Sequence, residues 1–284
     1  RVRGCQGIKA MTNYATPENT AVICLLNYRN EEVPATYGFF YQSAMRVGIK
    51  VEVYGRGEVY GPSGPRPGSP HWPYHNSYEA KILRLGKHIE SLPPNARYVL
   101  YVDARDTLFL RPLSDICDAF NRIGWPIVFG ATAKNHPHQD PAWMERFKKY
   151  KSGFNYLNAG MFMAERTALE NAFVKLVETH GEVEDDKIDS SATFLAVNDQ
   201  HIWQAAYVEG TIPIYLDHKQ DMFLNAHQVQ HEDYDFTLST EKTPIVMRSG
   251  AKPCVIHFPG HSSAAIPFAA WTLNLAALPA SKGA

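Results

Sequence analysis

The sequence lacks a long hydrophobic segment and has almost no net charge. No apolar run among its 284 residues approaches the roughly 20 residues that a transmembrane helix needs. Lys and Arg number 28 and Asp and Glu number 29, which gives a formal net charge of -1. A chain this balanced has no overall field to hold a nucleic acid or an anionic membrane. We therefore expect no membrane span and no nucleic-acid partner.

Cysteine is also scarce. Only Cys5, Cys24, Cys117 and Cys254 occur, far apart and without a Cys-x-x-Cys pair, which argues against a disulfide scaffold or a zinc ribbon. Cys24 and Cys254 lie in apolar runs, so we expect them to be buried thiols. No charged-then-apolar leader precedes the first apolar run, and we expect a cytoplasmic protein.

What the sequence does have is a normal hydrophobic content, 45%, arranged in two alternating patterns. Apolar runs of strand length lie at residues 21–26, 51–54, 98–102, 126–129, 158–163, 212–216 and 252–257, and helical periodicity at 37–47, 77–89, 112–122, 166–178 and from about 198. Strands that are apolar on both faces and joined by helices are typical of a parallel sheet covered on both sides. The pattern predicts one α/β domain over residues 1–284, with its core at about 20–263.

Residues 55–75 interrupt this pattern with a run rich in Gly and Pro. A segment this long without its own periodicity is either a flexible insertion or an active-site flap. Its aromatic residues, among them Tyr60, Trp72 and Tyr74, are unusual for a plain linker. Both interpretations stay open.

Asp103-x-x-Asp106 directly follows the apolar run 98–102. Ligands of open α/β sheets bind beyond the carboxyl ends of strands, and paired carboxylates there suit a hard divalent cation. His257 ends the last strand before a Pro-Gly turn and would add a nitrogen ligand, a mixed set that fits Mn²⁺ better than Ca²⁺. The alternatives are aspartates that cap the next helix and a histidine satisfied within the core.

Two further motifs have both a functional and a structural interpretation. Asn158-Ala159-Gly160 opens a strand with small residues, which permits a ligand to approach the backbone closely. Asn198-Asp199-Gln200 offers polar groups for a ligand, and it is equally typical of a helix N-cap with its first turn.

In their order and spacing, these motifs carry a family resemblance. They are Lys81 within residues 80–85, the segments 98–106 and 157–162, residues 198–200, and the segments 214–218 and 256–257. The chain resembles the glycosyltransferase domain of the collagen-modifying lysyl hydroxylases and their procollagen glycosyltransferase relatives, over roughly residues 20–263. That resemblance implies a GT-A fold, a Rossmann-like, mostly parallel sheet flanked by helices that binds a UDP-sugar through Mn²⁺ or Mg²⁺.

Carried over residue by residue, the resemblance implies three sets of site residues. The metal ligands are Asp103, Asp106 and His257, and the catalytic carboxylate is Asp199. The residues expected near the donor are Leu25, Asn27, Trp72, Lys81, Asn158, Gly160 and Gln200. Two departures from the family pattern are Asn198-Asp199 in place of a longer acidic run, and Phe258-Pro259-Gly260 where the family has Gly-Asn-Gly.

The sequence therefore predicts a metal-dependent glycosyltransferase that moves a hexose, glucose or galactose, from a UDP-sugar to a hydroxyl of a small molecule, glycan or peptide. Two other classes of function remain open. The same aspartates could serve a metal-dependent nucleotide-sugar hydrolase or nucleotidyltransferase. A sugar- or nucleotide-binding module could keep the fold without turnover.

Overall fold

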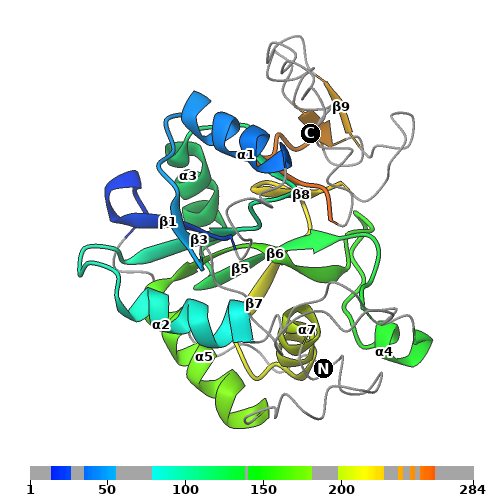
Figure 1. Cartoon of the computed structure of the whole chain (residues 1–284). Coiled ribbons are helices and arrows are strands. Elements are labelled where there is room, and N and C mark those ends of the chain that lie inside the picture. The colour runs from blue at the N-terminus through cyan, green and yellow to red at the C-terminus, as the bar shows by residue number, and fades with distance from the viewer. Residues whose placement is uncertain are drawn as a thin grey trace, which may run out of the picture.

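A six-stranded sheet forms the centre of the computed structural model, which describes residues 14–26, 35–55, 79–137, 140–180, 198–226, 236–238, 244–246 and 250–259 (Figure 1). The strand order is β2-β1-β3-β6-β5-β7. Strand β6 pairs antiparallel with β3 and β5, whereas the other pairs are parallel, so the remaining five strands run in one direction. The bounds are β1 Thr20–Leu25, β2 Glu52–Tyr54, β3 Tyr98–Val102, β5 Ile127–Thr132, β6 Tyr156–Glu165 and β7 Ile214–Asp217.

Helices cover both faces of this sheet (Figure 1). One face carries α1 (Ala35–Arg46) and α3 (Leu113–Ile123). The other carries α2 (Leu85–Glu90), α5 (Arg166–His180) and α7 (Asp199–Glu209). The π-helical segment η3 (Glu79–Arg84) leads into α2, and two further short helices are η1 (Pro17–Asn19) and α4 (Pro141–Glu145).

Each helical layer packs on the sheet through its own buried core. On the α2, α5 and α7 side, Trp203 of α7 lies against Phe129 and Phe162 of the sheet and against Phe173 of α5. Burying one such large apolar side chain contributes about 1.5–3 kcal/mol. This packing fixes where α7 begins, and therefore where its first residue, Asp199, lies.

A second, three-stranded sheet of order β4-β11-β8 lies beyond the carboxyl end of β3. Its strands are β4 (Thr107–Phe109), β8 (Phe223–Asn225) and β11 (Val255–His257). The register pairs His257 with Thr107 on one side and with Asn225 on the other. Two further strands, β9 (Phe236–Leu238) and β10 (Pro244–Val246), pair antiparallel with each other.

The predicted strands and helices all have counterparts in the structure, and Cys24 and Cys254 are buried as expected. The prediction did not include the antiparallel direction of β6 or the short strands β4, β8, β9 and β10. Residues 56–78, which hold most of the Gly/Pro-rich segment, lie outside the described residues.

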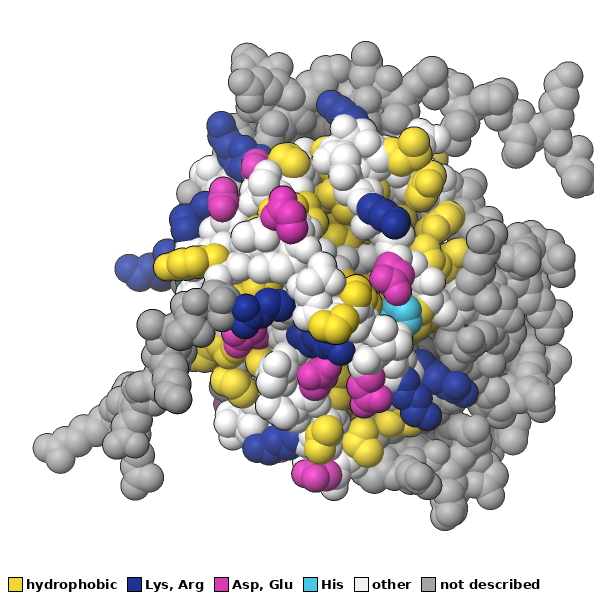
Figure 2. All heavy atoms as spheres, turned by 90° about the vertical axis from the view of Figure 1, so that its left-hand side faces the viewer, with side chains coloured by type: hydrophobic (Ala, Val, Ile, Leu, Met, Phe, Trp, Pro, Cys, Tyr) yellow, Lys and Arg dark blue, Asp and Glu magenta, His cyan; other side chains and the backbone are white. Residues whose placement is uncertain are grey.

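No helix in the described part of the chain is long and apolar enough to cross a membrane. On the face shown in Figure 2, basic and acidic side chains are interspersed among apolar ones. This mixture agrees with the net charge of -1.

Candidate functional site

The candidate site begins at Asp103, the first residue after β3. Its backbone N–H donates to the carbonyl oxygen of Gly160 on the neighbouring β6, 2.8 Å away. The Tyr101 hydroxyl donates to Asp103 Oδ1 at 2.9 Å. These bonds hold the Asp103 carboxylate at the edge of the sheet, where its side chain keeps 24% of its exposure.

The second sheet brings Asp106 and His257 to the same place. Phe258 N–H donates to the Asp106 carbonyl oxygen at 2.8 Å, which fixes the turn before β4 against the end of β11. His257 Nε2 then lies 3.2 Å from Asp106 Oδ1 and 4.0 Å from Asp103 Oδ2. One potential ligand atom from each of the three residues lies within 4.8 Å of the other two.

The chemistry of these three side chains fits a divalent cation. Burial alone would raise the pKa of Asp106, but the His257 imidazole beside it lowers that pKa below its ordinary value, which favours the carboxylate. Asp106 Oδ1 is an acceptor, and Nε2 is also one when the imidazole proton is on Nδ1, so in that tautomer a cation between the two atoms can bind both. Two carboxylates and one imidazole suit Mn²⁺ or Mg²⁺ more than a soft metal.

Gly160 of β6 leaves the space that the His257 ring fills. A Cβ at this position would overlap His257 Cε1 and would lie 2.9 Å from Nδ1. The small residues of 158–160 were expected to let a ligand approach the backbone, and in the structure the group that approaches Gly160 is this imidazole.

Lys81 of η3 joins the two acidic parts of the site. Its Nζ lies 2.8 Å and 3.0 Å from the two carboxylate oxygens of Asp103, and 3.8 Å from Asp199 Oδ2. Burial alone would lower the pKa of Lys81, but the carboxylates of Asp103 and Asp199 raise it above its ordinary value. The ammonium group therefore stays charged beside the three candidate ligands.

Asp199 is placed by the start of α7. The Asn198 side chain accepts from His201 N–H at 3.0 Å, so residue 198 is the helix N-cap that was one of the two expected interpretations. Asp199 is buried in the first turn, where the helix dipole favours a negative charge. Its carboxylate thus lies near the Lys81 ammonium that also contacts Asp103, with Oδ2 3.8 Å from Nζ.

Gln200 connects α7 to the start of β6. Its Oε1 accepts from Asn158 Nδ2 at 3.1 Å and from Ala159 N–H at 3.2 Å, while its Nε2 donates to the His136 carbonyl oxygen. Asn158 Oδ1 in turn accepts from Gly160 N–H at 3.0 Å. The structure therefore brings Asn158, Gly160 and Gln200 together, with both ends of the Gln200 amide bonded to the protein.

The remaining donor-side predictions fall at the edge of the described region. Leu25 ends β1, which neighbours β3 in the sheet, and it packs half-buried against the core. Asn27 and Trp72 lie outside the described residues.

Two contributors were not predicted from the sequence. Asn225 Oδ1 lies 2.9 Å from His257 Nδ1, the ring nitrogen that faces away from Asp106. Buried Gln204 donates to Asn135, His136 and Leu157, and so fixes the loop behind Gln200. Asn225 is the last residue of the three-residue strand β8, which is too short to give a sequence pattern, so no sequence signal pointed to it.

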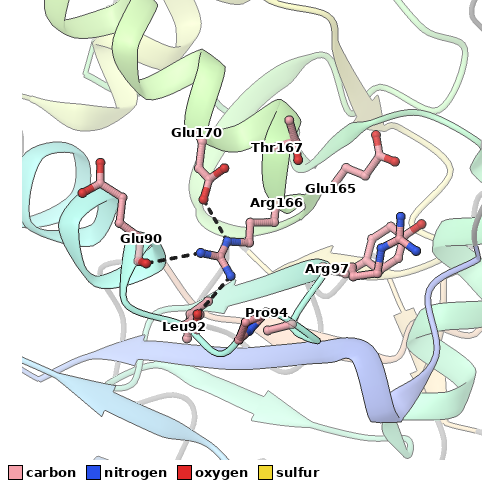
Figure 3. A pocket seen from close by; sticks show the side chains of 10 residues that line it. Glu90, Leu92, Pro94, Arg97, Glu165, Arg166, Thr167 and Glu170 are labelled. Atoms are coloured by element: carbon pink, nitrogen blue, oxygen red, sulfur yellow. Dashed lines mark hydrogen bonds and ion pairs between the residues drawn. The ribbon is translucent and has the colours of Figure 1, made fainter.

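A separate cavity of about 470 Å³ lies at the opposite end of β3 (Figure 3). Arg166 crosses it and donates to the Glu170 carboxylate and to the carbonyl oxygens of Glu90 and Leu92. Because the Arg166 guanidinium hydrogen-bonds to groups of the protein, it links α5 to the end of α2. The cavity is not part of the candidate site.

The mixed sheet covered by helices, with acidic residues after its strand β3, agrees with the GT-A fold that the resemblance implies, because open α/β sheets bind ligands beyond the carboxyl ends of their strands. The family model described as the PLOD GT domain matches residues 30–269. The chain therefore belongs to this glycosyltransferase family, which confirms the resemblance noted from the sequence.

Two solved structures are similar to this chain over most of its length. A glycosyltransferase involved in the glycosylation of the major capsid of PBCV-1 is 11% identical, with a TM-score of 0.47 over 90% of this chain and 99% of that one. Mouse xyloside xylosyltransferase 1 in its apo form is 10% identical, with a TM-score of 0.47 over 86% and 98% of the two chains. No curated protein matches the sequence.

Proposed function

We propose that this glycosyltransferase transfers a hexose, glucose or galactose, from a UDP-sugar to a hydroxyl group of a small molecule, glycan or peptide. Transfer requires Mn²⁺, with Mg²⁺ as the second candidate, held by Asp103, Asp106 and His257. The observation that carries the proposal is the convergence of these three side chains at the end of β3, beside the Lys81–Asp199 pair.

The leaving group of this reaction is a diphosphate, on which negative charge develops as the glycosidic bond breaks. A divalent cation held by the three ligands would act as a Lewis acid that offsets this charge. Lys81 adds a fixed positive charge in the same region, because two carboxylates keep it protonated. Once the Lys81 ammonium no longer contacts Asp103, it can donate hydrogen bonds to a diphosphate oxygen.

Asp199 is the proposed catalytic carboxylate. Lys81 and the N-terminus of α7 stabilise its charged form, which can accept hydrogen bonds from the hydroxyls of the sugar and the acceptor. In an inverting reaction this carboxylate takes the acceptor proton as a general base. In a retaining reaction a leaving phosphate oxygen takes it, and Asp199 orients the hydroxyls.

The first test is donor binding and turnover with and without Mn²⁺. A ligand at a hundredfold excess over its dissociation constant stabilises the folded chain by about 2.7 kcal/mol, which raises the unfolding midpoint measurably. We expect a UDP-hexose to give this shift in the presence of Mn²⁺, and to release UDP when an acceptor is added. No shift with any nucleotide sugar from a well-folded chain would contradict the proposal.

The products separate the rival functions. UMP and sugar phosphate would indicate a nucleotide-sugar hydrolase, and binding without any donor consumption would indicate a binding module. The double variant D103A/D106A is expected to lose Mn²⁺-dependent transfer. Its matched control is D115A/D118A, which removes an Asp-x-x-Asp pair of the same spacing from α3 and should keep transfer near the wild-type rate.

A further inference from the structure

The two ring nitrogens of His257 face different partners. Nε2 faces Asp106 at 3.2 Å, and Nδ1 faces Asn225 Oδ1 at 2.9 Å on the other side of the ring. A neutral imidazole carries one proton, and the nitrogen without it is the one that can bind a metal. Whatever decides which nitrogen holds the proton therefore decides whether His257 is a competent ligand.

The orientation of the Asn225 amide is determined by its surroundings. Its Nδ2 donates to the Ala131 carbonyl oxygen at 3.0 Å, and a carbonyl can only accept. The amide nitrogen must therefore point toward Ala131, which leaves Oδ1 to face His257. Because Oδ1 is an acceptor without a proton, the 2.9 Å contact requires the proton to be on Nδ1.

The strand register and the glycine next to Asn225 both permit its contact with His257. Asn225 and His257 are register partners on the parallel strands β8 and β11, so their side chains lie next to each other. A Cβ on Gly130 of β5 would lie 2.8 Å from Asn225 Nδ2, so a glycine leaves the room for the amide, as Gly160 leaves the room for the imidazole. Gln220 Oε1 accepts from Asn225 N–H at 3.3 Å and completes the support.

We propose that Asn225 is a positioning residue of the metal site, which holds the His257 proton on Nδ1 and thereby presents Nε2 to the cation between Asp103 and Asp106. This inference rests on the proposed metal site. Hydrogen-bond partners of this kind set both the ring orientation and the tautomer of a ligating histidine, and their loss typically weakens metal binding 10- to 100-fold.

The test compares two substitutions of nearly the same size. N225L removes the acceptor, and we expect Mn²⁺ to bind about 10- to 100-fold more weakly, measured by the electron paramagnetic resonance signal of free Mn²⁺. N225D keeps an acceptor facing Nδ1 and should bind Mn²⁺ within about threefold of the wild type or more tightly. A folded N225L that binds Mn²⁺ with wild-type affinity would overturn the proposal. So would an N225D that binds Mn²⁺ about 10- to 100-fold more weakly than the wild type.

The matched control is T107V on the opposite side of His257. Thr107 Oγ1 is buried and has no hydrogen-bond partner among the described residues, so its loss should leave the Mn²⁺ affinity unchanged. A T107V that weakens binding as much as N225L does would mean that any change beside β11 disturbs the site, and would overturn the specific assignment.

A second measurement needs no variant that alters Asn225. Nitrogen-15 NMR of the metal-free wild-type chain at pH 8 reports whether His257 Nδ1 carries a proton, with the resonance assigned by its absence from H257Q. We expect a proton on Nδ1, and an Nδ1 without one overturns the Asn225 assignment alone. A wild-type chain that binds no Mn²⁺ overturns instead the metal site on which it rests.

Discussion

Lys81 lies between two carboxylates that come from different parts of the chain. Its Nζ contacts both oxygens of Asp103, at 2.8 and 3.0 Å, and lies 3.8 Å from Asp199 Oδ2. The ammonium group thus connects the candidate metal ligands to the candidate catalytic carboxylate. Its positive charge should weaken the binding of a cation beside Asp103 and stabilise the leaving diphosphate, so removing it should change metal binding and transfer in opposite directions.

Replacing Lys81 with methionine should affect metal binding and transfer in opposite directions. K81M keeps the length of the side chain and removes a positive charge beside Asp103, so Mn²⁺ should bind as tightly as in the wild type or more tightly. Transfer should fall about 10²- to 10³-fold, because a charge that stabilises the leaving diphosphate is lost. Mn²⁺ titration and initial rates of UDP release measure the two effects.

The matched control for K81M is K87M. Lys87 lies on the adjoining helix α2, and its side chain is exposed. The same change of charge there should leave both affinity and rate within about twofold, since exposed substitutions usually have small effects. A K81M variant that loses Mn²⁺ affinity tenfold would argue that Lys81 organises the ligands and does not act on the donor.

Gly160→Ala should damage the metal site through a steric effect alone. The added Cβ would overlap the His257 ring, which is buried and cannot move aside freely. Overpacking of this kind costs about 1–3 kcal/mol of stability, and we expect Mn²⁺ affinity to fall at least tenfold as the imidazole is displaced. Urea denaturation and Mn²⁺ titration of the same preparation measure both effects.

Gly38→Ala provides the control for the same substitution elsewhere. A Cβ at Gly38 in helix α1 meets no atom within 4 Å, and alanine favours a helix over glycine by up to about 1 kcal/mol. G38A should therefore be as stable as the wild type or more stable, with unchanged Mn²⁺ binding. If G160A behaved like G38A, His257 would not depend on the space beside β6.

The long, doubly buried elements of this fold could be predicted from the sequence. The β3 bounds, Tyr98–Val102, coincide with the predicted strand, because a run buried on every residue has a clear sequence pattern. The short strands β4 and β8 could not be predicted. Three residues carry too little periodicity, and their pairing depends on β11, far along the chain.

Some residues of the candidate site could likewise be predicted from the sequence, and the contacts of others could not. Asp103 could be identified because a charged residue directly after a buried strand marks a sheet edge. The contacts of Lys81 with Asp103 and Asp199 could not, because they depend on how η3, β3 and α7 pack together. The contact of Asn225 with His257 could not be predicted either, because it depends on the register between β8 and β11.

The loop between β7 and β8 depends on Asp217. Its buried carboxylate accepts from the backbone N–H groups of Asp221, Met222 and Phe223 at 3.0, 2.7 and 2.9 Å. In D217N one of the two oxygens becomes an NH₂ group that faces N–H donors. We expect a loss of about 1–3 kcal/mol in the free energy of unfolding, measured by urea denaturation at pH 7.

Asp217 should also make stability depend on pH. Burial raises its pKa from 3.8 to about 6, although the three N–H donors act in the opposite direction. Between these values the folded chain binds more protons than the unfolded chain, so proton binding by Asp217 adds stability that is fully present below about pH 4 and is lost as the pH rises through 6. The stability of the wild type relative to D217N should therefore fall between pH 4 and pH 7.

The control for both measurements is D118N, an exposed aspartate on α3. This variant should differ from the wild type by less than about 0.5 kcal/mol. A wild-type advantage over D217N that grows with pH would contradict the raised pKa of Asp217.

The last prediction separates catalysis from metal binding. Asp199 is buried at the start of α7 and is outside the group of Asp103, Asp106 and His257. D199N keeps the size of the side chain, so Mn²⁺ affinity should stay within about threefold, while transfer falls about 10²- to 10⁴-fold if Asp199 is the general base. If the product retains the anomeric configuration of the donor, the carboxylate only orients hydroxyls, and a loss nearer the lower end is expected. An equal loss of Mn²⁺ binding and transfer would instead place Asp199 among the ligands.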